Sequence, residues 1–169
     1  MMENNENSKI LIISHKRMGK TTVANMLCEM TNLRFKDSSM AAAEIFIFDE
    51  LKDKYGYETF EECFKDRVNH RSEWYNLICD YNKDDKARLA KEILKENDIY
   101  VGMRDKEEID ECNKQGLFDY IIGVYDPDKE EESSDSFNID LFREADFIIR
   151  TGRDKEKVKK IVKLIHWTL

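Results

Sequence analysis

An aliphatic run near the amino end is followed by a short polar loop and then by a segment with helical periodicity. The run lies in residues 9–13, and it is typical of a central strand in a parallel sheet, which is covered on both faces. Beyond the loop, Val23, Met26, Leu27 and Met30 recur at the spacing of one helix face. A buried strand, a tight turn and an amphipathic helix in this order favour an α/β fold.

The intervening loop, residues 14–21, fits the pattern G-x-x-x-x-G-K-[ST] at every position except the first. Such a phosphate loop wraps backbone N–H groups around phosphate oxygens, and the following helix presents its positive dipole end. Its lysine reaches the terminal phosphates, and its hydroxyl residue ligates Mg²⁺. The residues predicted to bind the phosphate-bearing cofactor are Ser14, Lys16, Met18, Gly19, Lys20, Thr21 and Thr22, with Thr21 also a metal ligand.

Ser14 stands where the pattern has glycine. We expect a strain of about 1 kcal/mol there if the position requires a left-handed backbone. The alternative is a strand, turn and helix in which Gly19, Lys20 and Thr21 form an ordinary turn without a ligand.

Composition limits the classes of protein to consider. The chain has 169 residues, a length that suits one domain. Charged residues make up 38% of it and its formal net charge is −8, so we do not expect nucleic acid to be its main partner. The four cysteines have no metal-ligand spacing, and no apolar run approaches membrane-spanning length. The polar amino end has no signal-peptide pattern. We therefore expect a cytoplasmic protein with no membrane partner; a homodimer stays open.

Strand and helix patterns alternate along the rest of the chain. Further strands are expected at residues 33–36, 98–103, 118–126 and 147–149, and further helices at residues 40–55, 66–80, 84–97, 106–115, 139–144 and 154–167. Residues 37–39 are expected to cap the first of these helices and Gly56 to end it, although its β-branched and aromatic residues leave a strand open at 40–55. Thr59 and Glu62 have the spacing of a capping box at the start of the next helix. This order predicts a three-layer, doubly wound parallel sheet of about five strands, of the P-loop NTPase type. Residues 38–96 would form a helical insertion that binds a second substrate, and residues 127–144 a lid-like segment.

Arginine and aromatic residues of the insertion are candidates for holding that second substrate. Arg67 and Arg71 are spaced i, i+4 and would share a helix face, as would His70 and Trp74. Paired guanidinium groups suit a phosphate, and an aromatic wall suits a base. The alternative for both arginines is a solvated face with ion pairs to Asp66 or Glu73. The predicted acceptor-binding residues are Arg67, His70, Arg71, Trp74, Arg88, Gly102 and Arg104.

Several carboxylates follow the expected strands. Ligands of such sheets bind at the carboxyl ends of the strands, where Asp105 and Asp126 lie. Asp105 is the predicted second metal residue, since it could order waters around Mg²⁺. For Asp126 we expect surface solvation. For residues 130–132, all glutamates, we expect a solvated loop, and the alternative is an acidic loop that limits lid closure.

Several blocks of the sequence resemble the deoxynucleoside monophosphate kinases of tailed bacteriophages, relatives of the adenylate and other nucleoside monophosphate kinases. The blocks are HKRMGKTTVA at 15–24, FIFDELKD at 46–53, RVNHRSEW at 67–74, DIYVGMR at 98–104 and FD at 118–119. The resemblance implies transfer of the γ-phosphoryl group of ATP, with Mg²⁺, to a deoxynucleoside monophosphate for DNA precursor supply. It implies donor contacts from Lys20 and Thr21, and acceptor contacts from Arg67, Arg71, Arg88 and Arg104.

The resemblance also assigns roles near the carboxyl end. Lys20, Arg104 and Arg143 are the expected catalytic residues, with Arg143 acting from the lid, and Thr151 and Gly152 lie where these kinases contact adenine. The chain lacks the paired lid arginines of that family. Two alternatives therefore stay open: a P-loop kinase for another small acceptor, and a catalytically weak module that binds or senses nucleotides.

Overall fold

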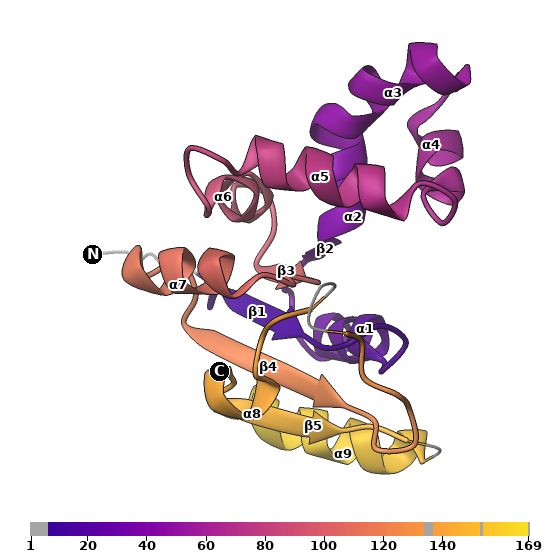
Figure 1. Cartoon of the computed structure of the whole chain (residues 1–169). Coiled ribbons are helices and arrows are strands. Elements are labelled where there is room, and N and C mark those ends of the chain that lie inside the picture. Colours follow the sequence, from indigo (N-terminus) through magenta and orange to yellow (C-terminus); the bar gives the residue numbers. More distant parts are fainter. Residues whose placement is uncertain (1–6, 134–136, 153, 169) are drawn as a thin grey trace.

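The computed structural model describes residues 7–133, 137–152 and 154–168. Their elements, drawn in Figure 1, are β1 (Ile10–Ile13), α1 (Lys20–Met30), β2 (Phe35–Asp37), α2 (Ser38–Ala42), the π-helical turn η1 (Ala43–Ile47), α3 (Phe48–Tyr55), α4 (Phe60–Asp66), α5 (Arg71–Tyr81), α6 (Arg88–Leu94), β3 (Ile99–Val101), α7 (Lys106–Lys114), β4 (Tyr120–Tyr125), α8 (Leu141–Glu144), β5 (Phe147–Arg150) and α9 (Lys155–His166).

One parallel sheet runs through the described part of the chain. Its five strands lie in the order β2-β3-β1-β4-β5, so β1 is central and pairs with both β3 and β4. Alternate β1 residues face opposite sides, since a strand has a period of two. Ile10 and Ile12 pack with α1 and α9, whereas Leu11 and Ile13 pack with α2, α6 and α7. The predicted three-layer, doubly wound parallel sheet is confirmed.

The helices between β2 and β3 extend beyond the sheet (Figure 1). They occupy most of residues 38–96, which the sequence identifies as the insertion. Their first helix begins at Ser38 and is capped by Asp37, whose carboxylate accepts from the N–H of Ser39 at 2.9 Å. The helical path continues through η1 and α3 to Gly56. This resolves the choice between helix and strand for residues 40–55 in favour of helix.

The prediction of a continuous helix at residues 66–80 is wrong. Helix α4 ends at Asp66, two turns follow, and α5 begins at Arg71. The side chain of Asp66 accepts from Tyr57, Asn69 and the His70 ring, and these bonds hold the break. The helix at residues 84–97 is also shorter than expected, because residues 84–87 form a turn before α6.

Candidate functional site

The phosphate loop begins with Ser14, which does not have the strained backbone considered for a serine at this position. Among described non-glycine residues, only Arg17 has a positive φ, at 63°. Ser14 is buried, and its hydroxyl donates to the carbonyl of His15 at 2.8 Å. The left-handed residues of the loop are Arg17 and Gly19, whose φ is 96°. A serine therefore fits the first position without strain, and the unusual backbone lies at Arg17, which the sequence did not single out.

Thr151, at the end of β5, fixes the far side of the loop. Its hydroxyl donates to the carbonyl of Met18 at 2.7 Å, and a Cβ on Gly19 would lie 3.4 Å from its methyl group. Gly152 follows and is exposed. Thr151, expected near adenine, thus also supports the loop itself. Thr21 and Thr22 are exposed in the first turn of α1, where the helix N–H groups are free.

Lys20 lies against the carboxyl ends of β2 and β3. A Cβ on Gly102 would lie 3.6 Å from Cε of Lys20 and 2.9 Å from Oγ of Ser38, so only glycine fits there without a shift. Burial lowers the pKa of Lys20, and the nearby charge of Arg104 lowers it further, while Asp37 and Glu132 oppose this. A buried cation beside a second cation favours an anionic ligand. Asp37, which the sequence identified only as a helix cap, is part of this environment.

A cavity of about 740 Å³ joins the phosphate loop to the insertion. The residues expected at the site that line it are Lys16, Lys20, Arg67, Arg71, Trp74, Gly102, Arg104 and Asp105. They come from the loop, from the ends of α4 and β3, and from α5. A smaller hollow of about 240 Å³ lies between Lys36, Glu44 and Glu92, and no residue of the phosphate loop lines it.

Arg67 and Arg71 both line the cavity, but not as neighbours on one helix face. Arg67 caps the end of α4 and stacks on the ring of Phe64 at 3.8 Å, whereas Arg71 is the first residue of α5. The ion pairs considered for them do not form, because Asp66 binds His70 and Glu73 binds Lys54. Arg71 is exposed, and no described side chain forms an ion pair with it.

Trp74 and His70, expected as a pair, separate. Trp74 lines the cavity but is only 4% exposed, and its Nε1 has no hydrogen-bond partner in the described part of the protein. His70 lies outside the cavity lining, where its Nε2 contacts Asp66 at 3.0 Å and its ring packs on Tyr55. Trp74 is thus a wall of the cavity, while His70 supports the α4–α5 junction.

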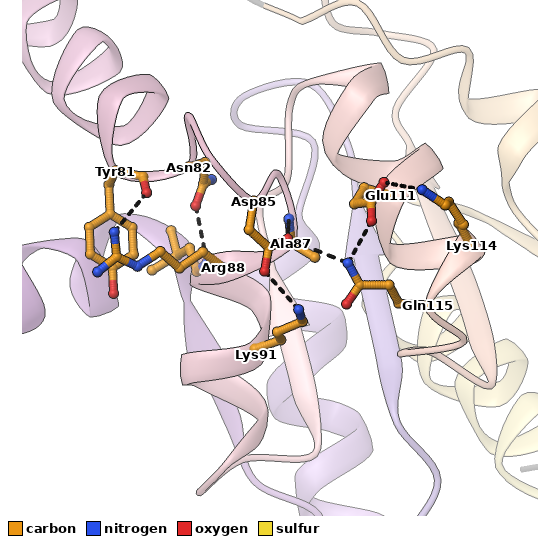
Figure 2. Close-up of polar contacts among 10 residues, drawn as sticks. Tyr81, Asn82, Asp85, Ala87, Arg88, Lys91, Glu111, Lys114 and Gln115 are labelled. Carbon is orange, nitrogen blue, oxygen red and sulfur yellow. Dashed lines mark hydrogen bonds and ion pairs between the residues drawn. The ribbon is translucent and has the colours of Figure 1, made fainter.

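Arg88 and Arg143 lie outside the cavity lining. Figure 2 shows Arg88 against Tyr81: its Nη1 donates to the Tyr81 carbonyl at 3.3 Å, and its guanidinium lies 4.0 Å from the ring centre. Arg143 lies in α8 with its side chain 79% exposed. Neither arginine therefore contributes to the cavity that Lys16 and Lys20 line.

Few residues of the cavity could serve as protein ligands for Mg²⁺. The described residues contain no cluster of three or more His, Cys, Asp or Glu side chains that could hold a metal ion. Mg²⁺ beside a nucleotide usually takes one or two protein oxygens together with phosphates and waters. The Thr21 hydroxyl fits that role. Asp105 lines the cavity, although its carboxylate also caps α7 by accepting from the N–H of Glu107 at 3.1 Å.

The acidic segment after β4 packs on the phosphate loop. Asp126 is 6% exposed and lies 3.4 Å from Nζ of Lys129, and the side chain of Glu132 is 8% exposed. The surface solvation expected for Asp126 and for Glu132 is therefore wrong. The sequence missed Glu132 because a run of three glutamates is typical of solvated loops; its only signal was its place after a strand that borders β1. Residues 134–136 of the expected lid segment lie outside the described residues.

Solved structures with a similar fold include kinases that act on small molecules. A dephospho-CoA kinase from Campylobacter jejuni superposes with a TM-score of 0.55 at 12% identity, over 95% of this chain and 96% of its own. A shikimate kinase from Bacteroides thetaiotaomicron gives 0.52 at 14% identity, over 95% and 97%. The chain has the P-loop kinase fold. No protein-family model and no curated protein sequence matches it. None of the described helices is both long and apolar enough to cross a bilayer.

Proposed function

We propose that the protein transfers the γ-phosphoryl group of ATP, with Mg²⁺, to a deoxynucleoside monophosphate. One observation carries the proposal: a single cavity is lined by Lys20 and the phosphate loop on one side and by Arg67, Arg71 and Arg104 on another. Phosphoryl transfer needs positioning and neutralisation of charge, and no covalent intermediate. A donor loop and an acceptor clamp on one cavity meet that need.

Different residues of the cavity would bind the donor, the metal ion and the acceptor. The loop amides and Lys20 would hold the donor phosphates, and Thr21 would hold Mg²⁺, which neutralises developing charge when bound. Arg67, Arg71 and Arg104 would bind the acceptor phosphate, because guanidinium groups donate two hydrogen bonds in one plane. Trp74 and Tyr75, both in the cavity lining, would form the wall beside the base.

A hydrogen bond inside the protein supports the binding of an anion by the phosphate loop. The N–H of Lys16 donates to a carboxylate oxygen of Glu132 at 2.6 Å, which is a short, charge-assisted bond. An amide of this loop therefore binds a carboxylate oxygen, and a phosphate oxygen makes the same kind of bond. This supports a phosphate ligand at the loop and, with it, ATP as the donor.

A coupled assay of ADP release tests the proposal with each of the four deoxynucleoside monophosphates and the matching ribonucleotides. We expect turnover with at least one of them, and its absence above the Lys20→Ala background would contradict the proposal. Shikimate and dephospho-CoA, the substrates in the names of the structural neighbours, belong in the same panel. Turnover with one of these alone would identify a kinase for another small acceptor.

A nucleotide-binding module without turnover is the second candidate, favoured by the exposure of Arg143 outside the cavity. With no lid arginine at the phosphate loop, the transferred group would lack one source of charge stabilisation. Tight ATP binding, no ADP release with any acceptor and a stable protein partner would support this second candidate.

A further inference from the structure

The carboxylate of Glu132 connects the two sides of the cavity. Its Oε2 accepts from the N–H of Lys16 at 2.6 Å, and both of its oxygens lie 2.9 Å from Nη1 of Arg104. All three residues line the same cavity as Lys20. One buried carboxylate thus bonds both an amide of the donor loop and the arginine proposed to grip the acceptor.

Two further bonds hold this carboxylate in place. The N–H of Glu132 donates to Nδ1 of His15 at 2.9 Å, and Nζ of Lys129 donates to the carbonyl of Arg17. We name residues 129–132 the acidic strap. The strap is bonded to each of the loop residues 15, 16 and 17, so its position over the loop is specific.

The donors that Glu132 uses are those that a phosphoryl group needs. Backbone amides of a phosphate-binding loop and guanidinium groups bind phosphate and carboxylate oxygens alike. Burial alone would raise the pKa of Glu132, but the charge and hydrogen bond of Arg104, with the Lys16 amide, hold that pKa below its ordinary value. The carboxylate is therefore an anion at neutral pH, placed where two anion donors converge.

We propose that Glu132 is an internal substitute for a substrate phosphoryl group. Without nucleotide its carboxylate occupies the Lys16 amide and Arg104, and a bound polyphosphate must displace it to gain those donors. That the displacing anion is a nucleotide rests on the proposed function. The apparent affinity for the polyphosphate therefore equals its intrinsic affinity multiplied by the fraction of molecules in which the strap is released.

Glu131 provides a matched control next to the residue under test. Its carboxylate is 59% exposed and lies 4.0 Å from Nε2 of His15. No contact joins it to the Lys16 amide or to Arg104 among the described residues. Glu131→Gln and Glu132→Gln remove the same charge from the same strap, and only the second removes the internal ligand.

Calorimetry with inorganic triphosphate, and with the β,γ-imido analogue of ATP plus Mg²⁺, measures the competition. We expect Glu132→Gln to bind both about tenfold more tightly than the wild type and Glu131→Gln to stay within twofold. Glu132→Asp keeps the charge but shortens the reach, so its affinity should also rise. Unchanged or weaker binding by folded Glu132→Gln and Glu132→Asp would overturn the inference.

Amide hydrogen exchange of Lys16 tests the contact without any ligand. In the wild type its N–H should exchange more slowly than in Glu132→Gln, and equal rates would also overturn the inference. If triphosphate binds in a Lys20-dependent way but no acceptor is phosphorylated, the proposed function fails and the inference stands. If triphosphate binds to no variant, both fail.

Discussion

On the donor side of the cavity, the backbone of residues 16–18 is bonded by the acidic strap and by Thr151, whereas the acceptor side depends on long side chains at a junction between two short helices. Backbone groups fixed from two directions have little freedom left to lose on binding. An exposed side chain such as that of Arg71 loses rotamer entropy when it grips a ligand. Apart from Glu132, which a bound polyphosphate would displace, substitutions on the donor side should therefore affect the rate, and those on the acceptor side should affect the affinity for the substrate.

The carboxyl groups of Glu132 and Glu108, whose side chains are buried in the cavity wall, differ in their state of ionisation. Arg104 keeps Glu132 ionised, as described above, whereas burial raises the pKa of Glu108 from 4.5 to about 7, against the hydrogen bond from Asn82 at 2.7 Å. A neutral amide partner does not compensate a buried negative charge as a guanidinium does. The donor side thus carries a fixed charge, and the wall formed by α7 carries a group that titrates near neutral pH.

Lys20→Ala should have the largest effect. Under the proposed function, kcat should fall about 10³-fold, because the variant loses a charge that stabilises the transferred phosphoryl group. Lys163→Ala, on the exposed face of α9, removes the same charge far from the cavity and should leave kcat unchanged. A loss below tenfold in Lys20→Ala, measured by the coupled assay, would contradict the role given to the donor side.

The pH dependence of the free energy of unfolding tests whether burial raises the pKa of Glu108. Because the pKa of Glu108 is raised on folding, its contribution to the free energy of unfolding is fully present below pH 4.5 and is lost as the pH rises to about 7. Glu108→Gln removes this loss. Urea unfolding should show the wild type losing about 3 kcal/mol relative to Glu108→Gln between pH 4.5 and 8. A pH-independent difference would mean that folding does not raise the pKa of Glu108.

Gly102→Ala tests how closely the strand end fits Lys20. The new Cβ would lie 2.9 Å from Oγ of Ser38 at a φ of 108°, so we expect a loss of about 2 kcal/mol in the free energy of unfolding and a shift of Ser38 and of the strand end beside Lys20. Turnover should fall at least tenfold with it. Gly56→Ala has a φ of 73° but open space around it, and it should cost about 1 kcal/mol without changing turnover. Equal behaviour of the two variants would refute a specific role for Gly102.

Arg71→Ala should have the smallest of these effects and should act on affinity. We expect KM for the acceptor to rise about tenfold with kcat changed little, because a charge-assisted hydrogen bond to the bound phosphate is lost. Arg88→Ala, whose guanidinium lies on Tyr81 outside the cavity lining, should leave KM unchanged. A larger effect of Arg88→Ala would show that the insertion rearranges when substrate binds.

Local signals account for most of what the sequence predicted correctly. Thr59 and Glu62 form the expected capping box, and Gly56 ends α3 in a left-handed conformation. Each is a contact between residues a few positions apart, so spacing alone reveals it. The i, i+4 pairing of Arg67 and Arg71 failed because the break before Arg71 has no glycine or proline. It is held by Asp66 bonds that include one to Tyr57, nine residues away.

By itself, the sequence determined the central strand, the phosphate loop with Lys20, the insertion between β2 and β3, and the strand–helix order that produces the parallel sheet. Only the tertiary structure decided which arginines line the cavity with Lys20 and that Glu132, 116 residues after Lys16, bonds that loop. The physical reason is range. Periodicity and capping act within a few residues, whereas the charges that meet in a cavity are set by how separate elements pack at the ends of the strands.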